Sequence, residues 1–103
     1  MNLLVDLPVA LSTEETTLLL QGEQVRIERI VSCGQSSPPG FWYDQDEDEW
    51  LLLLTGCGAI EFADGRIVIL TAGDTLLIPA GERHRVASTA TDEPTVWLAV
   101  FHR

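Results

Sequence analysis

The chain has 103 residues, 46% of them hydrophobic, and its six basic and sixteen acidic residues give a formal net charge of −10 at pH 7. This length predicts a single domain over residues 1–103, and this hydrophobic content argues against a disordered chain. Because the negative charge repels phosphate backbones and anionic lipid headgroups, we expect neither nucleic acid nor a membrane surface as a partner.

The sequence also bears on where the protein resides. No run reaches the roughly 18 consecutive apolar residues of a membrane-spanning helix, and the first residues lack the basic start and long apolar stretch of a signal peptide. We therefore expect a cytoplasmic protein in which Cys33 and Cys57 stay reduced. These two cysteines lack CxxC spacing and predict no zinc site.

The first predicted element is one short helical turn, because Ser12-Thr13-Glu14-Glu15 has the pattern of a helix capping box. The next is a strand over residues 24–32, where polar and apolar residues alternate for most of the length. Alternation of this kind indicates one wet face. It predicts that Arg26, Glu28 and Arg29 occupy exposed positions.

The middle of the chain is a loop followed by an apolar strand. Ser, Pro and Gly dominate residues 34–40, and the acidic run Asp44–Glu49 comes after them. Within that run we expect residues 46–48 to be solvated. Residues 50–54 are apolar on both faces, which is typical of a buried strand.

Further short strands are separated by turn signals. They are predicted over residues 59–62, 66–70, 75–78, 86–89 and 95–101, and Asp64-Gly65 marks a tight hairpin between the first two. Seven or eight short strands joined by Gly, Pro and Asp turns predict an all-β antiparallel sandwich or barrel. An eight-stranded jelly roll fits this pattern.

The stretch from Gly73 to His84 has an unusual spacing: Gly, five residues, Pro, one residue, Gly, two residues, His. Its glycines suit turns, and Pro79 ends the strand before it because proline has no N–H for a ladder hydrogen bond. The stretch therefore presents His84 at the start of a strand. A lone histidine there is a candidate site residue, or simply a hydrogen-bonded or surface side chain.

This spacing resembles the second sequence motif of the cupin superfamily. The first motif of that family is represented upstream by Glu49 and Gly56 at the expected separation, but its two histidines are missing. Their places fall on Tyr43 and Gln45, or on Trp42 and Asp44, depending on the gap. The resemblance implies an all-β double-stranded β-helix, or jelly-roll barrel.

The resemblance also implies a metal site. Similar cupins hold one divalent metal, usually iron, manganese, nickel or zinc, with two histidines, a glutamate and the later histidine. Here it implies Glu49 and His84 as ligands, and Asp44 or Gln45 could add an oxygen. The sequence does not decide which of these two faces inward. The alternative is a barrel without metal in which Glu49 and His84 pair through a charge-assisted hydrogen bond.

Several aromatic residues are candidates for the wall of a ligand pocket. Trp42 and Tyr43 follow the Pro-Pro-Gly loop and adjoin the candidate ligands, so they could line a pocket or pack in the core. Trp50 and Trp97 are flanked by aliphatic residues and are expected in the core. The other imidazole, His102, is the penultimate residue and is expected to fray.

Three classes of function agree with these features, and the sequence leaves open whether the protein is an enzyme. The first is a small protein that binds a divalent metal and a small molecule in the barrel, with catalysis as one use of the metal. The second is a metal-free module that binds a small ligand. The third is an assembly subunit, since we expect a homodimer and the apolar strand at Leu51–Leu54 could form its interface.

Overall fold

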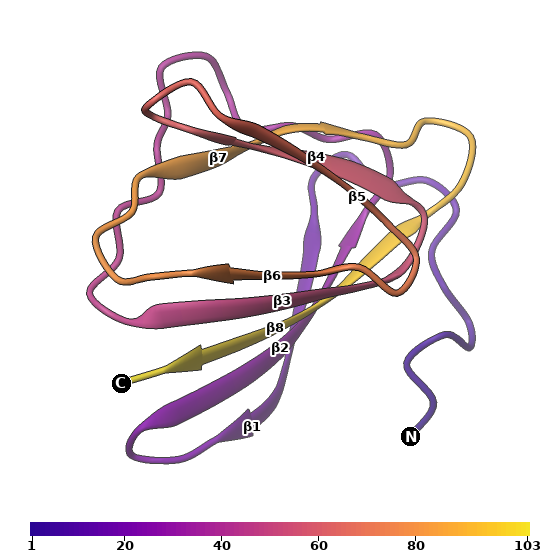
Figure 1. Cartoon of the computed structure of the whole chain (residues 1–103). Coiled ribbons are helices and arrows are strands. Elements are labelled where there is room, and N and C mark those ends of the chain that lie inside the picture. Colours follow the sequence, from indigo (N-terminus) through magenta and orange to yellow (C-terminus); the bar gives the residue numbers. More distant parts are fainter.

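The computed structural model describes all 103 residues, Met1–Arg103, and contains eight strands and no helix. The strands are β1 (Glu15–Gln21), β2 (Val25–Ser32), β3 (Asp48–Thr55), β4 (Cys57–Phe62), β5 (Ile67–Thr71), β6 (Thr75–Ile78), β7 (His84–Thr89) and β8 (Thr95–His102). Their order along the chain can be followed by colour in Figure 1. The structure contains no helix that is long and apolar enough to cross a membrane.

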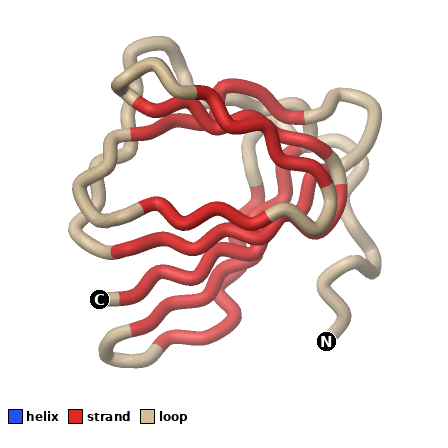
Figure 2. The backbone as a smooth tube through the Cα atoms, viewed as in Figure 1, coloured by secondary structure: helices blue, strands red, loops and turns tan.

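The strands form two antiparallel sheets that face each other. The larger sheet has the order β1-β2-β8-β3-β6, and the smaller one has the order β5-β4-β7. Neighbours in each sheet are often distant in sequence, so the chain crosses repeatedly between the two layers (Figure 1, Figure 2). This is the predicted all-β jelly-roll barrel.

Alternation along the strands places one face of each sheet in the core. In β3 the residues Glu49, Leu51 and Leu53 are buried, while their neighbours are only half-buried. The central cluster combines buried residues of both sheets: Leu51, Leu53, Ile60, Phe62, Leu70, Ile78, Trp97, Ala99 and Phe101. The hydrophobic core therefore lies between the two layers.

The N-terminal prediction was wrong. Residues 12–15 form no helical turn, and Glu15 instead opens β1, which pairs with β2 from Glu15 opposite Val31 to Gln21 opposite Arg26. Hydrogen bonding to β2 and the strand preference of Thr16 and Thr17 outweigh the capping pattern. An eighth strand therefore forms one edge of the larger sheet.

Two further expectations were wrong because of how β3 and β8 lie in the larger sheet. Trp50 is half-buried on the outer face of β3, because Glu49 and Leu51 on either side of it face the core. His102 does not fray, since it lies in β8 between Val25 of β2 and Asp48 of β3. The expectation for Trp97 was right, because only 3% of this residue is exposed.

The close approach of β4 to the Trp97 indole depends on a glycine. A Cβ atom added at Gly58 would lie 2.5 Å from two ring carbons of Trp97, well inside van der Waals contact. The absence of a side chain at Gly58 therefore allows the largest core residue to span the gap between the sheets.

We expect the Gly58→Ala substitution to lower the free energy of unfolding by about 1–3 kcal/mol, because the Trp97 ring must shift in a packed core. Urea denaturation followed by circular dichroism measures this change. Gly65→Asn is the matched control: Gly65 has a left-handed backbone with nothing within 4 Å of its Cβ position, and asparagine tolerates that conformation. If Gly58→Ala and the wild type have the same free energy of unfolding, the Trp97 indole does not pack tightly against β4.

Candidate functional site

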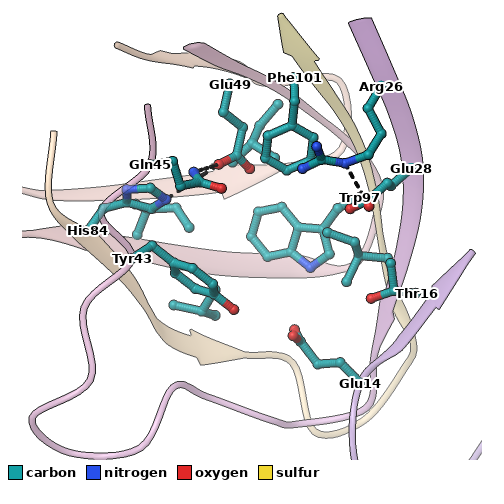
Figure 3. Close-up of a pocket in the computed structure, with 14 residues that line it drawn as sticks. Glu14, Thr16, Arg26, Glu28, Tyr43, Gln45, Glu49, His84, Trp97 and Phe101 are labelled. Carbon is teal, nitrogen blue, oxygen red and sulfur yellow. Dashed lines mark hydrogen bonds and ion pairs between the residues drawn. The ribbon is translucent and has the colours of Figure 1, made fainter. Parts of the chain in front are cut away.

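A cavity of about 300 Å³ lies between the two sheets. The larger sheet and the residue before it contribute Glu14, Thr16, Arg26, Glu28, Ile30, Glu49, Leu51, Trp97 and Phe101; the smaller sheet contributes Ile60, His84 and Val86; and the loop between β2 and β3 contributes Tyr43 and Gln45. Figure 3 shows the polar members of this set around one space. The barrel interior is therefore part packed core and part polar cavity.

Glu49, Gln45 and His84 form one corner of the cavity. Gln45 Nε2 donates to Glu49 Oε1 at 3.0 Å, and His84 Nε2 lies 3.4 Å from the same oxygen (Figure 3). Backbone hydrogen bonds hold the segments together, since Gly81 N–H donates to the Gln45 carbonyl at 2.7 Å. The turn of the second motif thus fixes the loop that carries Gln45.

His84 is held in a defined orientation. Its Nδ1 lies 2.9 Å from the Glu82 carbonyl oxygen, which can only accept, so Nδ1 carries a proton and Nε2 faces Glu49. Burial alone would lower the pKa of His84, but the contacts to Glu49 and to the Glu82 carbonyl outweigh burial, and the pKa is raised. Both ring nitrogens therefore face acceptors, which favours the imidazolium form beside the Glu49 carboxylate.

Tyr43 forms the wall next to this corner. Its backbone exchanges two hydrogen bonds with His84, and its ring stacks on the imidazole with centroids 5.4 Å apart. Burial raises the pKa of Tyr43, and the nearby carboxylates of Glu14 and Glu49 raise it further. The phenol therefore stays protonated and can donate a hydrogen bond within the cavity.

A chain of hydrogen bonds positions Glu14 on the opposite side. Trp97 Nε1 donates to Ser32 Oγ at 3.2 Å, and Ser32 Oγ donates to Glu14 Oε2 at 2.7 Å. Ser32 is completely buried. Two buried groups thus orient a carboxylate that belongs to none of the ion pairs in the structure.

The charged residues of β2 correct two expectations. Arg26 and Glu28 line the cavity instead of facing open solvent, and the Arg29 side chain is only 11% exposed. Arg26 pairs with Glu28 at 3.0 Å and with Glu47 at 2.9 Å, and its guanidinium lies over the Phe101 ring. Glu47 is therefore a partner of Arg26, with a side chain only 15% exposed, and not a freely solvated residue.

The structure separates the residues singled out in the sequence. Gln45, Glu49, His84 and Tyr43 line one cavity, whereas Asp44 is exposed and Trp42 lies outside the lining. Trp42 contacts Arg83 instead, with the guanidinium 5.8 Å from the ring centroid. Gln45, and not Asp44, therefore lies beside Glu49.

Other lining residues were missed by sequence reasoning. They are Glu14 and Thr16 near β1, Arg26 and Glu28 on β2, and Phe101 on β8. The sequence signal that could have identified Arg26 and Glu28 is the polar face of β2. That face points into the barrel, where it borders the cavity.

The donor set at the corner only partly suits a divalent metal. No group of three or more His, Cys, Asp and Glu side chains converges in a way that could hold an ion. Glu49 and His84 are two good ligands, and the Gln45 amide oxygen is a weaker third. An ion here would depend on water or a bound molecule for most of its coordination.

Comparisons with known proteins agree with the fold. The model of the family described as "Cupin domain" matches residues 27–101. A crystal structure from Ralstonia eutropha, of a protein named a "putative mannose-6-phosphate isomerase", is 48% identical, with a TM-score of 0.95 over 99% of this chain and 95% of that one. A cupin superfamily protein from Desulfitobacterium hafniense is 21% identical, with a TM-score of 0.78 over 93% of this chain and 83% of that one.

A match to a curated protein covers less of the chain. The uncharacterized protein YdbB of Bacillus subtilis is 41% identical over 58 residues, which is 56% of this chain. The match covers 49% of YdbB, so it spans about half the length of that relative.

The electrostatic setting of Tyr43 can be measured directly, because this is the only tyrosine in the chain. We expect a spectrophotometric titration near 295 nm to give a pKa above 10.0 for the phenol, and Glu14→Gln to lower it by removing a nearby negative charge. Because the pKa of Tyr43 is raised in the folded state, this phenol does not change the free energy of unfolding below pH 10. The free energy of unfolding falls as pH rises through the folded-state pKa. Glu15→Gln, one residue along and outside the cavity, is the control and should leave the titration unchanged. A wild-type pKa at or below 10.0 would contradict this geometry.

Proposed function

Because the chain belongs to the cupin domain family, we propose that it binds a small molecule in the cavity between its two sheets. One observation carries this proposal. Seven of the fourteen residues around a single cavity are hydrophobic, and the polar groups of Glu14, Tyr43 and Glu49 face the same space. A few converging polar groups in an apolar pocket are typical of small-molecule sites.

The cavity has polar atoms available for a ligand. The hydrogen bonds within the chain use one oxygen of Glu14 and one of Glu49, and they do not engage the Tyr43 hydroxyl. Tyr43 can donate, and the free carboxylate oxygens can accept. A molecule with hydroxyl or amine groups therefore suits this site.

The name of the Ralstonia protein suggests a sugar phosphate as a ligand to consider. The charges of this cavity do not favour one. Its two cationic side chains, Arg26 and His84, already lie against carboxylates. A phosphate would have no free cation to pair with, so we do not assign sugar-phosphate chemistry to this chain.

A divalent metal at the corner is the second candidate. The supporting observation is that the Glu82 carbonyl holds His84 Nδ1, which leaves Nε2 facing Glu49 in the cavity. Glu49 and His84 would hold the ion, and Gln45 could add its amide oxygen. A bound ion would act as a Lewis acid toward a molecule in the cavity. The homodimer and the cytoplasmic location remain predictions from the sequence.

A thermal-shift screen of small polar metabolites tests the main proposal. A ligand present at ten times its Kd stabilises the folded state by about 1.4 kcal/mol, which raises Tm by roughly 6–11 °C in a domain of this size. We expect Val86→Phe, which adds a ring inside the cavity, to abolish the shift. Val100→Phe on the outer face of β8 adds the same ring and should retain it. If no compound shifts Tm, or if Val86→Phe shifts as the wild type does, the cavity is not the binding site.

Elemental analysis of untagged protein, purified without chelator, separates the two candidates. If the small molecule binds without a metal, metal is well below stoichiometric and the ligand-induced Tm shift survives dialysis against EDTA. Glu49→Gln and His84→Ala variants are analysed in parallel, with circular dichroism to verify folding. Near-stoichiometric metal that disappears in both folded variants would instead establish the second candidate.

A further inference from the structure

We propose that the molecule bound in this cavity carries a protonated amine, which pairs with Glu14 between the Tyr43 hydroxyl and the Trp97 indole. The inference rests on the proposed small-molecule function and specifies the chemical class of the ligand. It follows from the charge balance of the cavity, from the way Glu14 is held, and from the groups around it.

The charge balance leaves Glu14 without a cation. Of the three lining carboxylates, Glu28 pairs with Arg26 and Glu49 pairs with His84. Arg26 is shared with a second carboxylate, that of Glu47. The cavity therefore has an excess of negative charge, and Glu14 is the carboxylate that a positive ligand group would neutralise.

The carboxylate is also held in place before any ligand arrives. The hydrogen bonds from Trp97 to Ser32 and from Ser32 to Glu14 Oε2 leave Oε1 free of any partner in the chain. Both donors are buried, Ser32 at 0% and Trp97 at 3% exposed. Fixing a charged group beforehand reduces the ordering cost of binding its partner.

The groups next to Glu14 suit an ammonium ion. In Figure 3 the Glu14 carboxylate points toward the space between Tyr43 and Trp97. The Tyr43 hydroxyl oxygen can accept a hydrogen bond from an ammonium ion.

A second hollow adjoins the cavity at the same residues. This hollow, of about 480 Å³, shares Glu14, Thr16 and Tyr43 with the cavity, so these three residues lie where the two spaces meet. Because no three carboxylate, imidazole or thiol groups converge, the geometry favours an organic cation over a metal ion at Glu14.

Isothermal titration calorimetry in EDTA-containing buffer tests the inference with two carbon skeletons, each of which carries an amine, a hydroxyl or a phosphate group. The probes are glucosamine, glucose and glucose 6-phosphate, and butylamine, butanol and butyl phosphate. We expect an amine to bind roughly ten- to a hundredfold more tightly than its neutral and phosphorylated counterparts. Glu14→Gln retains an acceptor for Ser32 and should remove this preference, whereas Glu15→Gln makes the same change in net charge outside the cavity and should not.

The outcomes distinguish this inference from the function on which it rests. Tighter binding of a neutral or phosphorylated probe, equal binding in Glu14→Gln and wild type, or no binding of either amine would overturn the amine assignment. If the metabolite screen has nevertheless found ligands sensitive to Val86→Phe, the cavity is still a binding site and only its ligand class was wrong. If that screen also found none, the proposed function fails as well.

Discussion

The packing of the Trp97 indole against the backbone of Gly58 is the contact on which the rest of the interior depends. Trp97 lies on β8 in the larger sheet and Gly58 on β4 in the smaller one, so their contact joins the two layers of the barrel. The indole belongs to the hydrophobic core and also lines the cavity. Its N–H begins the hydrogen-bond chain to Glu14. One side chain thus closes the core and positions a charge in the cavity.

Much of the architecture can be predicted from local sequence. The turn between Gly73 and His84 was predictable because glycine and proline restrict the backbone independently of distant contacts, and β6 has the predicted bounds, Thr75–Ile78. Glu49 and His84 were singled out by the resemblance to the two cupin motifs, and the structure brings them within 3.4 Å of each other. Strand positions also follow from alternation, which is a property of the chain itself.

The remaining features depend on which face of a strand is inside, and alternation does not reveal that. In most barrels the apolar face is inside, and this assumption misassigned Arg26 and Glu28, which face a polar cavity. Trp50 was misassigned for the same reason, because β3 is apolar on both faces and only the register with β6 and β8 identifies the inner one. The strand β1 was missed because its stability comes from pairing with β2, and a local pattern does not include that partner.

The position of β1 has a dynamic consequence for the cavity. This strand is an edge strand, hydrogen-bonded to β2 alone, and its pairing is interrupted by a register shift between Leu18 and Leu20. Edge strands open locally at a lower free-energy cost than the whole domain unfolds. Because Glu14 and Thr16 border the cavity from this strand and the residue before it, local opening of β1 removes one wall while the other sheet contacts persist. The cavity can therefore exchange its contents by fraying of one strand, without separation of the two sheets.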